Sequence, residues 1–495
     1  MIKFKKTACV FAAASLCLAL VLPAAGCAEN ARGEVVLRVC SWEEYIDLGG
    51  WDDGELIEIE NVYTDDGGVI GVNSMVDDFT EWFNENHDFN VRVEYSTFGT
   101  NEDLYNRLSL GDVYDIACPS DYMLMKLIAE ENYVEFSDAF WEDEEENYYA
   151  QFVSQYIDGA DGEGIFNKPE YDWHKKAACY MWGTLGIVYN PEFASAQDVS
   201  TWEMMLNEKY KKQVTIKDNV RDSYFAALGI LNGSKITAET TSEKLSLMMN
   251  ATDSETVASA EDVLKRIKEN VYSFETDSGK ADMVTGKVVA NEQWSGDAVY
   301  IMDEAEGDEE HSTELWYSVP EECTNIWFDG WIKLKNGVDW TDERHEAAEA
   351  FVNFLSRPDN AVRNMYYIGY TSAIAGETVF EYMDYNYGAE EDAEETFEYD
   401  LSYFFGEGSY ITADCSQFDF EDGENYIANR GRQLFAQYPP QNVIDRSVVM
   451  LDFGDRLADI NQMWINVRCL DIMDFSPVAV GVVCGIIVIG AVAIT

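Results

Sequence analysis

The chain has few basic residues for its size. Its 495 residues include 33 lysines and arginines against 93 aspartates and glutamates, for a formal net charge of −60. Phosphate binding needs a basic face, so nucleic acid and anionic membrane surfaces are excluded as partners. A field of this sign attracts cationic ligands. Most of the acidic residues have a simpler explanation, since they keep an exported protein soluble, and we expect only a few to contact a ligand.

Motifs of the common enzyme classes are missing as well. The sequence has no glycine-rich phosphate loop, no GxSxG and no HExxH. Paired carboxylates arise by chance in so acidic a chain, so they do not indicate a glycosidase. The four histidines lack the spacing of metal ligands, and we predict no metal site and no cofactor. They are His87, His174, His311 and His345.

No CxxC pair occurs among the ten cysteines. Four of the ten lie in or next to the terminal apolar segments. The other six lie mostly in apolar runs: Cys40, Cys118, Cys179, Cys323, Cys415 and Cys469. Three disulfides are one interpretation, with a connectivity that the sequence does not reveal. We favour free thiols that pack as small apolar groups.

The N-terminal residues have the pattern of a bacterial lipoprotein signal peptide. A lysine cluster precedes an apolar stretch, and Cys27 directly follows Ala-Ala-Gly. Ala24 replaces the usual leucine three positions before the cysteine. We predict that residues 1–27 form a lipoprotein-type signal peptide with lipidation at Cys27. Ordinary cleavage nearby, with Cys27 as a bystander, is the alternative.

Residues 475–495 at the C-terminus carry no charge and are rich in Val, Ile, Gly and Ala. They are just long enough to cross a bilayer, but no Lys or Arg follows to supply a positive-inside signal. A transmembrane anchor, the start of a longer membrane segment and a buried apolar helix are the three interpretations.

Between the two ends, apolar strands alternate with amphipathic helices. Residues 35–40 are β-branched and residues 89–95 alternate in polarity, so both are predicted strands. Between these two strands, residues 75–83 have apolar side chains at helical spacing and are predicted to form a helix. Gly49–Asn73 is predicted to be a loop insertion. The same signals recur in 102–110 (helix), 114–117 (strand) and 122–131 (helix). This alternation predicts an α/β fold with largely parallel sheets.

Eight short motifs follow one another from about residue 36 to residue 470. They are Ser41–Tyr45 (SWEEY), Tyr114–Tyr122 (YDIACPSDY), Trp182–Gly186 (WGTLG), Asp218–Asp222 (DNVRD), Gln293–Asp297 (QWSGD), Trp327–Gly330 (WFDG), Phe354–Asp359 (FLSRPD) and Ile368–Tyr370 (IGY). Each motif alone is weak evidence, but the occurrence of all eight motifs in this order along one chain is specific evidence. In these motifs the chain resembles the bacterial spermidine/putrescine-binding protein family, the extracellular receptors of polyamine ABC importers.

The resemblance implies a two-lobed periplasmic-binding-protein type II fold of the α/β class. In this fold, crossover hinge strands join two lobes that close on a ligand between them. We expect the crossovers near 180–186 and 327–335. Lobe 1 is then predicted to comprise residues 34–182 and 328–470, the latter with the C-terminal helices, and lobe 2 residues 183–327.

The resemblance also implies how the protein works. We expect a monomer that binds a polyamine outside the cell, passes it to an ABC permease with its ATPase subunit, and performs no catalysis. We expect it at the outer face of the cell membrane, tethered by lipid at Cys27, by the C-terminal apolar segment, or by both.

A polyamine is a flexible methylene chain with ammonium groups at intervals. Trp and Tyr rings offer flat faces for the methylenes and attract a cation by about 0.5–2 kcal/mol. A desolvated ammonium without a carboxylate is costly. We therefore expect a site of several Trp and Tyr with two or three Asp or Glu.

Positions in the family motifs imply nine ligand-binding residues. The resemblance implies that aromatic rings wall the cleft and stack on the methylenes, that Ser120 and Tyr122 offer hydroxyls to a terminal ammonium, and that two aspartates bind amines. The nine are Trp42, Tyr45, Ser120, Tyr122, Asp222, Trp294, Trp327, Asp329 and Tyr370. For Trp42, a plain core position is the alternative.

The chain departs from the family pattern at several points. Asn219 stands where some relatives carry an acid, and Asp218 either substitutes for it or caps a helix. A glutamine that relatives use near the C-terminus has no match in the run that starts at Met450. Asp297 has no family counterpart, so we expect it at the surface. Arg221 either braces the pocket carboxylates or points to a different ligand.

Three other functions are open at this point. The first is binding of another small cationic or amino-acid-like solute, since one fold hosts many ligands. The second is a secreted acid–base hydrolase, which needs two cleft carboxylates in opposed environments. The third is a signalling or adhesive surface protein that only retains the fold.

Overall fold

The computed structural model describes residues 33–50, 73–142, 173, 175–237, 239–276, 278–307, 312–390, 392–420 and 427–469. The strands are β1 (Glu34–Trp42), β2 (Asn90–Phe98), β3 (Ile116–Ala117), β4 (Ala177–Tyr189), β5 (Val214–Lys217), β6 (Ser273–Glu275), β7 (Ala290–Trp294), β8 (Trp316–Ser318), β9 (Thr324–Lys333), β10 (Thr371–Ser372), β11 (Thr396–Asp400), β12 (Tyr410–Asp414), β13 (Phe418–Phe420), β14 (Ile427–Gly431) and β15 (Ser447–Val448). The helices are α2 (Met75–Asn86), α3 (Asn101–Leu110), α4 (Asp121–Ala129), α5 (Asp138–Glu142), α7 (Ala196–Val199), α8 (Val220–Asn232), α9 (Ser242–Met249), α10 (Ser254–Asn270), α11 (Ser278–Val284), α12 (Ser295–Gly307), α13 (Asp342–Ser356), α14 (Pro358–Ile368), α15 (Glu377–Tyr387), α16 (Ser402–Phe405), α17 (Gln433–Gln437), α18 (Gln441–Ile444) and α19 (Leu457–Arg468).

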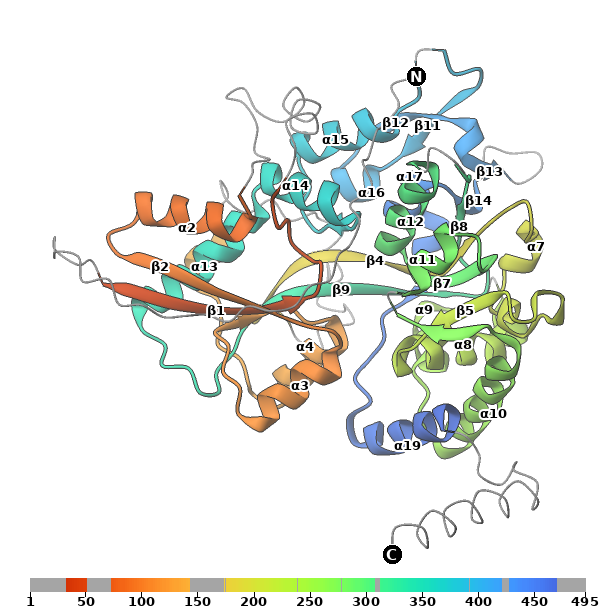
Figure 1. Cartoon of the computed structure of the whole chain (residues 1–495), viewed down its shortest axis with the longest axis horizontal. Helices are drawn as coiled ribbons and strands as arrows, with labels where there is room; N and C mark the ends of the chain where they lie inside the picture. Colours follow the sequence, from red (N-terminus) through yellow and green to blue (C-terminus); the bar gives the residue numbers. More distant parts are fainter. Residues whose placement is uncertain are drawn as a thin grey trace, which may run out of the picture.

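Two long strands, β4 and β9, run through the middle of the molecule and join its two halves (Figure 1). Every residue of both strands is buried. They pair antiparallel from Ala177 opposite Ile332 to Thr184 opposite Ile326. The first half of β4 therefore lies in one sheet, while its second half pairs with β7 and β8 in the other.

Each half of the molecule is an α/β lobe. In the first lobe, β1 lies parallel to β2 and β3, and α2 and α13 pack on this sheet. In the second lobe, β5 lies parallel to β6 and β7, α8 packs on β5, and α10 packs against α8. Both sheets point the carboxyl ends of their parallel strands toward the middle of the molecule, which is where α/β sheets bind ligands.

Local sequence explains where the helices of the first lobe begin and end. Ser74 and Thr100 precede α2 and α3, and each side chain accepts a hydrogen bond from a backbone N–H in the first turn. Gly111 ends α3 in the left-handed conformation, with φ of 103°. Phe79 and Phe83 lie one turn apart on the buried face of α2.

The predicted α/β class is confirmed, and so are the six predicted strands and helices between residues 35 and 131, within a few residues at their ends. The expectation of largely parallel sheets is wrong for the middle of the molecule. There β4 and β9 pair antiparallel with each other, and β7, β8 and β10 pair antiparallel with β4. Crossover strands must run from one lobe to the other and back, so their mutual pairing is antiparallel.

The predicted domain limits remain a prediction. Only part of the chain after β9 stays with the first sheet: α13 packs on that sheet, whereas β14 pairs with β8 and α19 packs against α10 of the second lobe. The predicted signal peptide with Cys27 and the predicted apolar helix over 475–495 lie outside the described residues, as does most of the predicted loop insertion. No helix within the described ranges is long and apolar enough to cross a membrane.

The six cysteines within the described ranges are free thiols, as we favoured, and none forms a disulfide with another described residue. Four are buried, Cys415 is partly buried and Cys469 is exposed.

A glycine lies at the point where β4 passes between the lobes. A Cβ on Gly183 would lie 2.4 Å from the Ser295 hydroxyl and 2.6 Å from the Trp327 ring. Gly183→Ala is therefore expected to lower the free energy of unfolding by about 1–3 kcal/mol through overpacking, measured by denaturant titration. Gly307→Ala is the control, since a Cβ there meets open space. Equal stability of the two variants would contradict this prediction.

Candidate functional site

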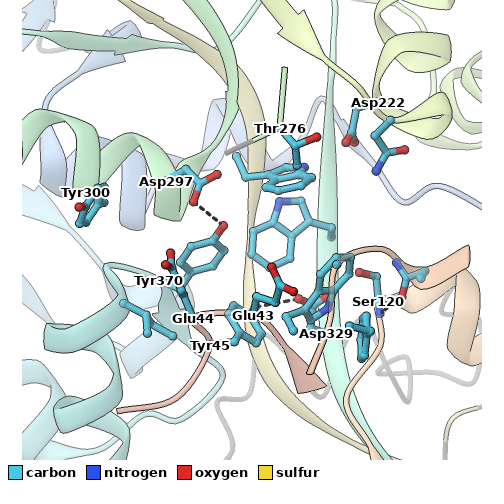
Figure 2. Close-up of a pocket in the computed structure, with 18 of the residues that line it drawn as sticks. Glu43, Glu44, Tyr45, Ser120, Asp222, Thr276, Asp297, Tyr300, Asp329 and Tyr370 are labelled. Atoms are coloured by element: carbon cyan, nitrogen blue, oxygen red, sulfur yellow. Dashed lines mark hydrogen bonds between the residues drawn. The ribbon is translucent and has the colours of Figure 1, made fainter. Parts of the chain in front are cut away.

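A cavity of about 490 Å³ lies between the lobes, at the carboxyl ends of their parallel strands. All nine residues predicted to bind a ligand line it: Trp42, Tyr45, Ser120, Tyr122, Asp222, Trp294, Trp327, Asp329 and Tyr370. Figure 2 shows the cavity walls, with aromatic rings in the middle and carboxylates around them. The structure thus brings together motifs that are separated by up to 328 residues in the sequence, from Trp42 to Tyr370.

The first cavity carboxylate belongs to Asp329 on β9. It is 6% exposed, and its Oδ2 accepts a hydrogen bond from the Tyr45 hydroxyl at 2.7 Å. Its buried Oδ1 has no hydrogen-bond partner among the described residues. Burial raises the pKa of Asp329 to about 6, although hydrogen bonds from Ser120 and Tyr45 oppose the shift.

The second cavity carboxylate belongs to Asp222 in the first turn of α8 and comes from the other lobe. The helix begins there because the Asn219 side chain caps it, accepting from the backbone N–H of Arg221. Asp222 is 4% exposed, and within the described ranges its Oδ2 has no partner. Burial raises its pKa to about 6, with the nearby ammonium of Lys217 opposing the shift.

Aromatic side chains from both lobes form the cavity walls. Tyr45 and Tyr370 meet edge to face at 5.2 Å between ring centroids, and Trp327 lies 5.7 Å from Tyr370. Trp42 is half-buried against Phe98 at 4.8 Å, so it lines the cavity as well as packing on the core. The indole N–H groups of Trp42 and Trp327 are buried and find no acceptor in the described part of the chain.

A buried ion pair positions Tyr45 and Tyr370. Asp47, two residues after Tyr45, is fully buried and pairs with Arg363 of α14, which is 1% exposed. The backbone N–H of Asp47 also donates to the Asn364 side chain at 2.9 Å. Because α14 ends just before Tyr370, these contacts hold the two tyrosine rings against each other.

Asn101 is a cavity residue that the sequence analysis missed. It is 1% exposed, its amide donates to the Tyr122 hydroxyl at 2.8 Å, and its Oδ1 accepts from the backbone N–H of Ser120 at 3.1 Å. Ser120 precedes α4, but its hydroxyl makes no capping hydrogen bond and stays beside Asp329. No sequence signal distinguishes Asn101 from an ordinary first residue of a helix.

Two expectations for polar residues were wrong. Asp297 is not at the surface: it is 4% exposed and lies at the cavity wall, because α12 begins directly at the end of β7. Asp218 neither faces the cavity nor caps a helix. It pairs with Arg468 of α19 at 2.8 Å, and Asn219 is the cap.

Arg221 makes no hydrogen bond or ion pair with Asp222 or Asp329 among the described contacts, and its charge acts on Asp222 only from a distance, where it opposes the rise in pKa. Its guanidinium lies between the rings of Tyr122 and Phe453, at 3.9 and 3.6 Å from their centroids, and donates to the Leu451 carbonyl. Met450, which begins the run where we found no match for the expected glutamine, lines the cavity.

Two lysines at the cavity were also missed. Lys217, at the end of β5, is fully buried, and Lys280 of α11 lines the cavity. Both pair with Asp297, at 3.2 and 3.4 Å. The end of a strand is a signal that could have identified Lys217, whereas Lys280 lies on a short helix that no motif marks.

The arrangement suits a cation with an apolar chain. Two buried carboxylates on opposite lobes each leave an oxygen without a described partner, and the rings between them present apolar faces. Bringing a positive charge to such carboxylates relieves the cost of their burial. The fold and this cavity define a two-lobed solute-binding protein.

Comparison with known proteins agrees with this class. The model of the family described as bacterial extracellular solute-binding protein matches residues 75–378, more than half of the chain. The chain belongs to this family, whose members bind solutes for transport and are not enzymes, which rules out the hydrolase alternative.

Among individual relatives, the spermidine/putrescine-binding periplasmic proteins of Salmonella typhimurium and Escherichia coli are 25% identical to the chain over 282 residues, covering 57% of it and 70% of each relative. A putrescine-binding periplasmic protein of Pseudomonas aeruginosa is 25% identical over 283 residues, covering 54% of the chain and 68% of the relative.

Solved structures show the same fold. The spermidine/putrescine ABC transporter substrate-binding protein PotD of Streptococcus pneumoniae matches with a TM-score of 0.53 and 20% identity, covering 87% of this chain and 98% of that one. The TpPotD lipoprotein of Treponema pallidum matches with a TM-score of 0.55 and 15% identity, covering 88% and 99%. The predicted periplasmic-binding fold is thereby confirmed.

The raised pKa of Asp222 predicts a stability cost. In the folded protein its pKa lies above its unfolded value, so ionisation opposes folding, and this cost grows as pH rises through about 4 to 6. Asp222→Asn is expected to raise the free energy of unfolding of the ligand-free protein by about 1–3 kcal/mol near pH 7 and by much less near pH 4, measured by denaturant titration.

Asp198→Asn is the matched control. Hydrogen bonds from Ser195 and Tyr210 lower the pKa of Asp198 to about 2, so its ionised form supports folding and the variant is expected to be less stable near pH 7. Loss of stability in Asp222→Asn at both pH values would instead show that this carboxylate holds the fold together.

Proposed function

We propose that this protein captures a polyamine of the spermidine/putrescine type outside the cell and delivers it to an ABC import permease with its ATPase. The observation that carries the proposal is the pair of buried carboxylates, Asp222 and Asp329, that face one aromatic cavity from opposite lobes. The names of the relatives support the same ligand class.

In this proposal each part of the cavity has a separate role. Asp329, held by Tyr45 and Ser120, pairs with one amine, and Asp222 pairs with another. The rings of Trp42, Trp294, Trp327 and Tyr370 stack on the methylenes, while Tyr122 offers its hydroxyl. A ligand that touches both lobes stabilises the closed form, and closure is what a permease can recognise. Nine residues thus form the proposed binding site.

The proposal extends to how the protein is held at the cell. Lipid at Cys27, the apolar segment 475–495, or both would tether a monomeric receptor at the outer face of the membrane, within reach of the permease. The domain limits predicted from the sequence, with crossovers in β4 and β9, are part of the same proposal.

A different cationic or amino-acid-like solute is the second candidate, and one observation favours it. Lys280 is a basic residue at the cavity wall, where a simple polyamine site would have none. Its ammonium lies 3.4 Å from Asp297, so it already has an anionic partner and does not require a carboxylate on the ligand. We therefore place polyamines first.

Calorimetric titration with putrescine, spermidine, spermine and lysine tests the proposal. We expect one-to-one binding of a polyamine that persists at about 0.3 M salt, because buried ion pairs are weakly screened. Asp329→Asn is expected to weaken it by about a hundredfold with the fold retained by circular dichroism, since truncating a buried charge pair costs about 2–5 kcal/mol.

Asp384→Asn provides the control, because Asp384 lies on α15 at the surface and outside the cavity. Binding that is weak, involves many sites and disappears with salt would reflect only the net charge, and the proposal would then be abandoned. Tight binding of lysine alone would favour the second candidate.

The raised pKa values predict how binding depends on pH. Asp222 and Asp329, each with a pKa of about 6, must lose protons to pair with ammoniums. Affinity is therefore expected to fall about tenfold per carboxylate between about pH 7.5 and pH 5. Glu292, whose pKa burial raises to about 8, stays mostly protonated over this range and does not add to the fall.

Titrations at several pH values check this expectation. In Asp222→Asn only one carboxylate remains to be deprotonated, so the logarithm of the affinity should fall about half as far over the same range. Affinity that stays constant down to about pH 5 would contradict the prediction.

A further inference from the structure

One end of the cleft already contains cations supplied by the protein. The carboxylate of Asp297, 4% exposed, lies 3.2 Å from the ammonium of Lys217 and 3.4 Å from that of Lys280. It also accepts a hydrogen bond from the Tyr370 hydroxyl at 3.0 Å. Burial opposes ionisation of Asp297, but the two lysines and this hydrogen bond outweigh it and lower its pKa. Asp297 is therefore an ionised carboxylate whose charge the protein itself balances.

Asp297 and Lys280 lie away from the two carboxylates proposed to bind the ligand, whereas the buried Lys217 is close enough to Asp222 to act on it as well as on Asp297. Figure 2 shows Asp297 and Tyr370 on one side of the cavity, and Asp222, Ser120 and Asp329 toward the other. The cleft is therefore polarised along its length. Carboxylates with unpartnered oxygens lie at one end. At the other end, Asp297 lies with two lysines, and the exposed carboxylate of Glu44 lies 3.9 Å from the ammonium of Lys280.

Of the two lysines, Lys280 lines the cavity and Lys217 lies buried behind its wall. Lys217 is fully buried, and its ammonium lies 3.5 Å from the centroid of the Trp294 ring, so one face of this ring is already covered by a cation. Lys280 lines the cavity with 18% of its side chain exposed. A ligand that extends toward Asp297 therefore meets the ammonium of Lys280.

We propose that Lys280 is a resident cation that determines how many charges the ligand carries. The cleft then takes an amine with two cationic groups, which pair with Asp222 and Asp329, and disfavours a longer amine whose third ammonium would approach Lys280. A short α,ω-diamine is the ligand class that fits. This inference rests on the proposed polyamine binding and adds to it the number of charges.

The test compares putrescine with spermidine by calorimetry on the full-length protein and its Lys280→Met variant. The wild type is expected to bind the diamine more tightly. Removing the ammonium is expected to tighten spermidine binding by about tenfold and to change putrescine binding by less than about threefold, because repulsion between like charges is lost only for the triamine. Lys280→Arg keeps the charge and should keep the preference of the wild type.

Lys287→Met is the matched control in the same lobe. Lys287 is a surface lysine that pairs with Asp282 at 2.8 Å, outside the cavity, so neither affinity should change. If circular dichroism shows that Lys280→Met does not fold, Lys280→Gln replaces it as the neutral variant.

The outcomes separate this inference from the function on which it rests. A ratio of spermidine to putrescine affinity that is the same in the neutral variant and the wild type would overturn the role of Lys280 and leave polyamine binding intact. A wild type that prefers spermidine would do the same. A wild type that binds neither amine in a one-to-one, salt-resistant manner would overturn both.

Discussion

The antiparallel pairing of β4 with β9 is the interaction on which the rest of the structure depends. These strands are buried along their whole length, so their backbone groups must be satisfied by each other and by neighbouring strands. The same ladder that joins the lobes carries Trp327 and Asp329, opposite Gly183 and Met181. The centre of the cleft is therefore held by the sheet, while the residues around it come from the loops that follow other strands.

Burial of charge is the second constraint. The two lobes place Asp222 and Asp329 in positions where ionisation is costly, and the chain does not neutralise either one with a direct salt bridge among the described residues. Some buried charges elsewhere are neutralised by the protein, as in the Asp47–Arg363 and Lys217–Asp297 pairs. Glu292 is also fully buried, has no salt bridge among the described residues and stays mostly protonated because burial raises its pKa to about 8. Asp222 and Asp329 differ from it because they line the cavity, where an incoming cation can reach them.

The Lys217–Asp297–Lys280 cluster shows how two kinds of charge can share one cavity. Asp297 follows β7 and Lys217 ends β5, so neighbouring parallel strands bring them together. Tyr370 reaches the same carboxylate from the other lobe. The cluster therefore connects the lobes at one end of the cleft, while the other end carries carboxylates for the ligand. In our proposal, the charge balance along the cleft, rather than the overall charge of −60, distinguishes one polycation from another.

The sequence by itself determined the α/β class, the first strands and helices, and nine residues that line the cavity. It could do so because strand and helix periodicity are local and because motifs of ligand contacts keep their order along the chain.

Only the tertiary structure decided which charges are neutralised. Asp297 looked like a surface acid and Lys280 carried no signal, yet the packing of α11 against α12 places them 3.4 Å apart. The antiparallel middle of the sheet was also invisible beforehand, since strand direction depends on how the chain returns between lobes. Pairing and burial arise between segments far apart in sequence, and no local pattern records them.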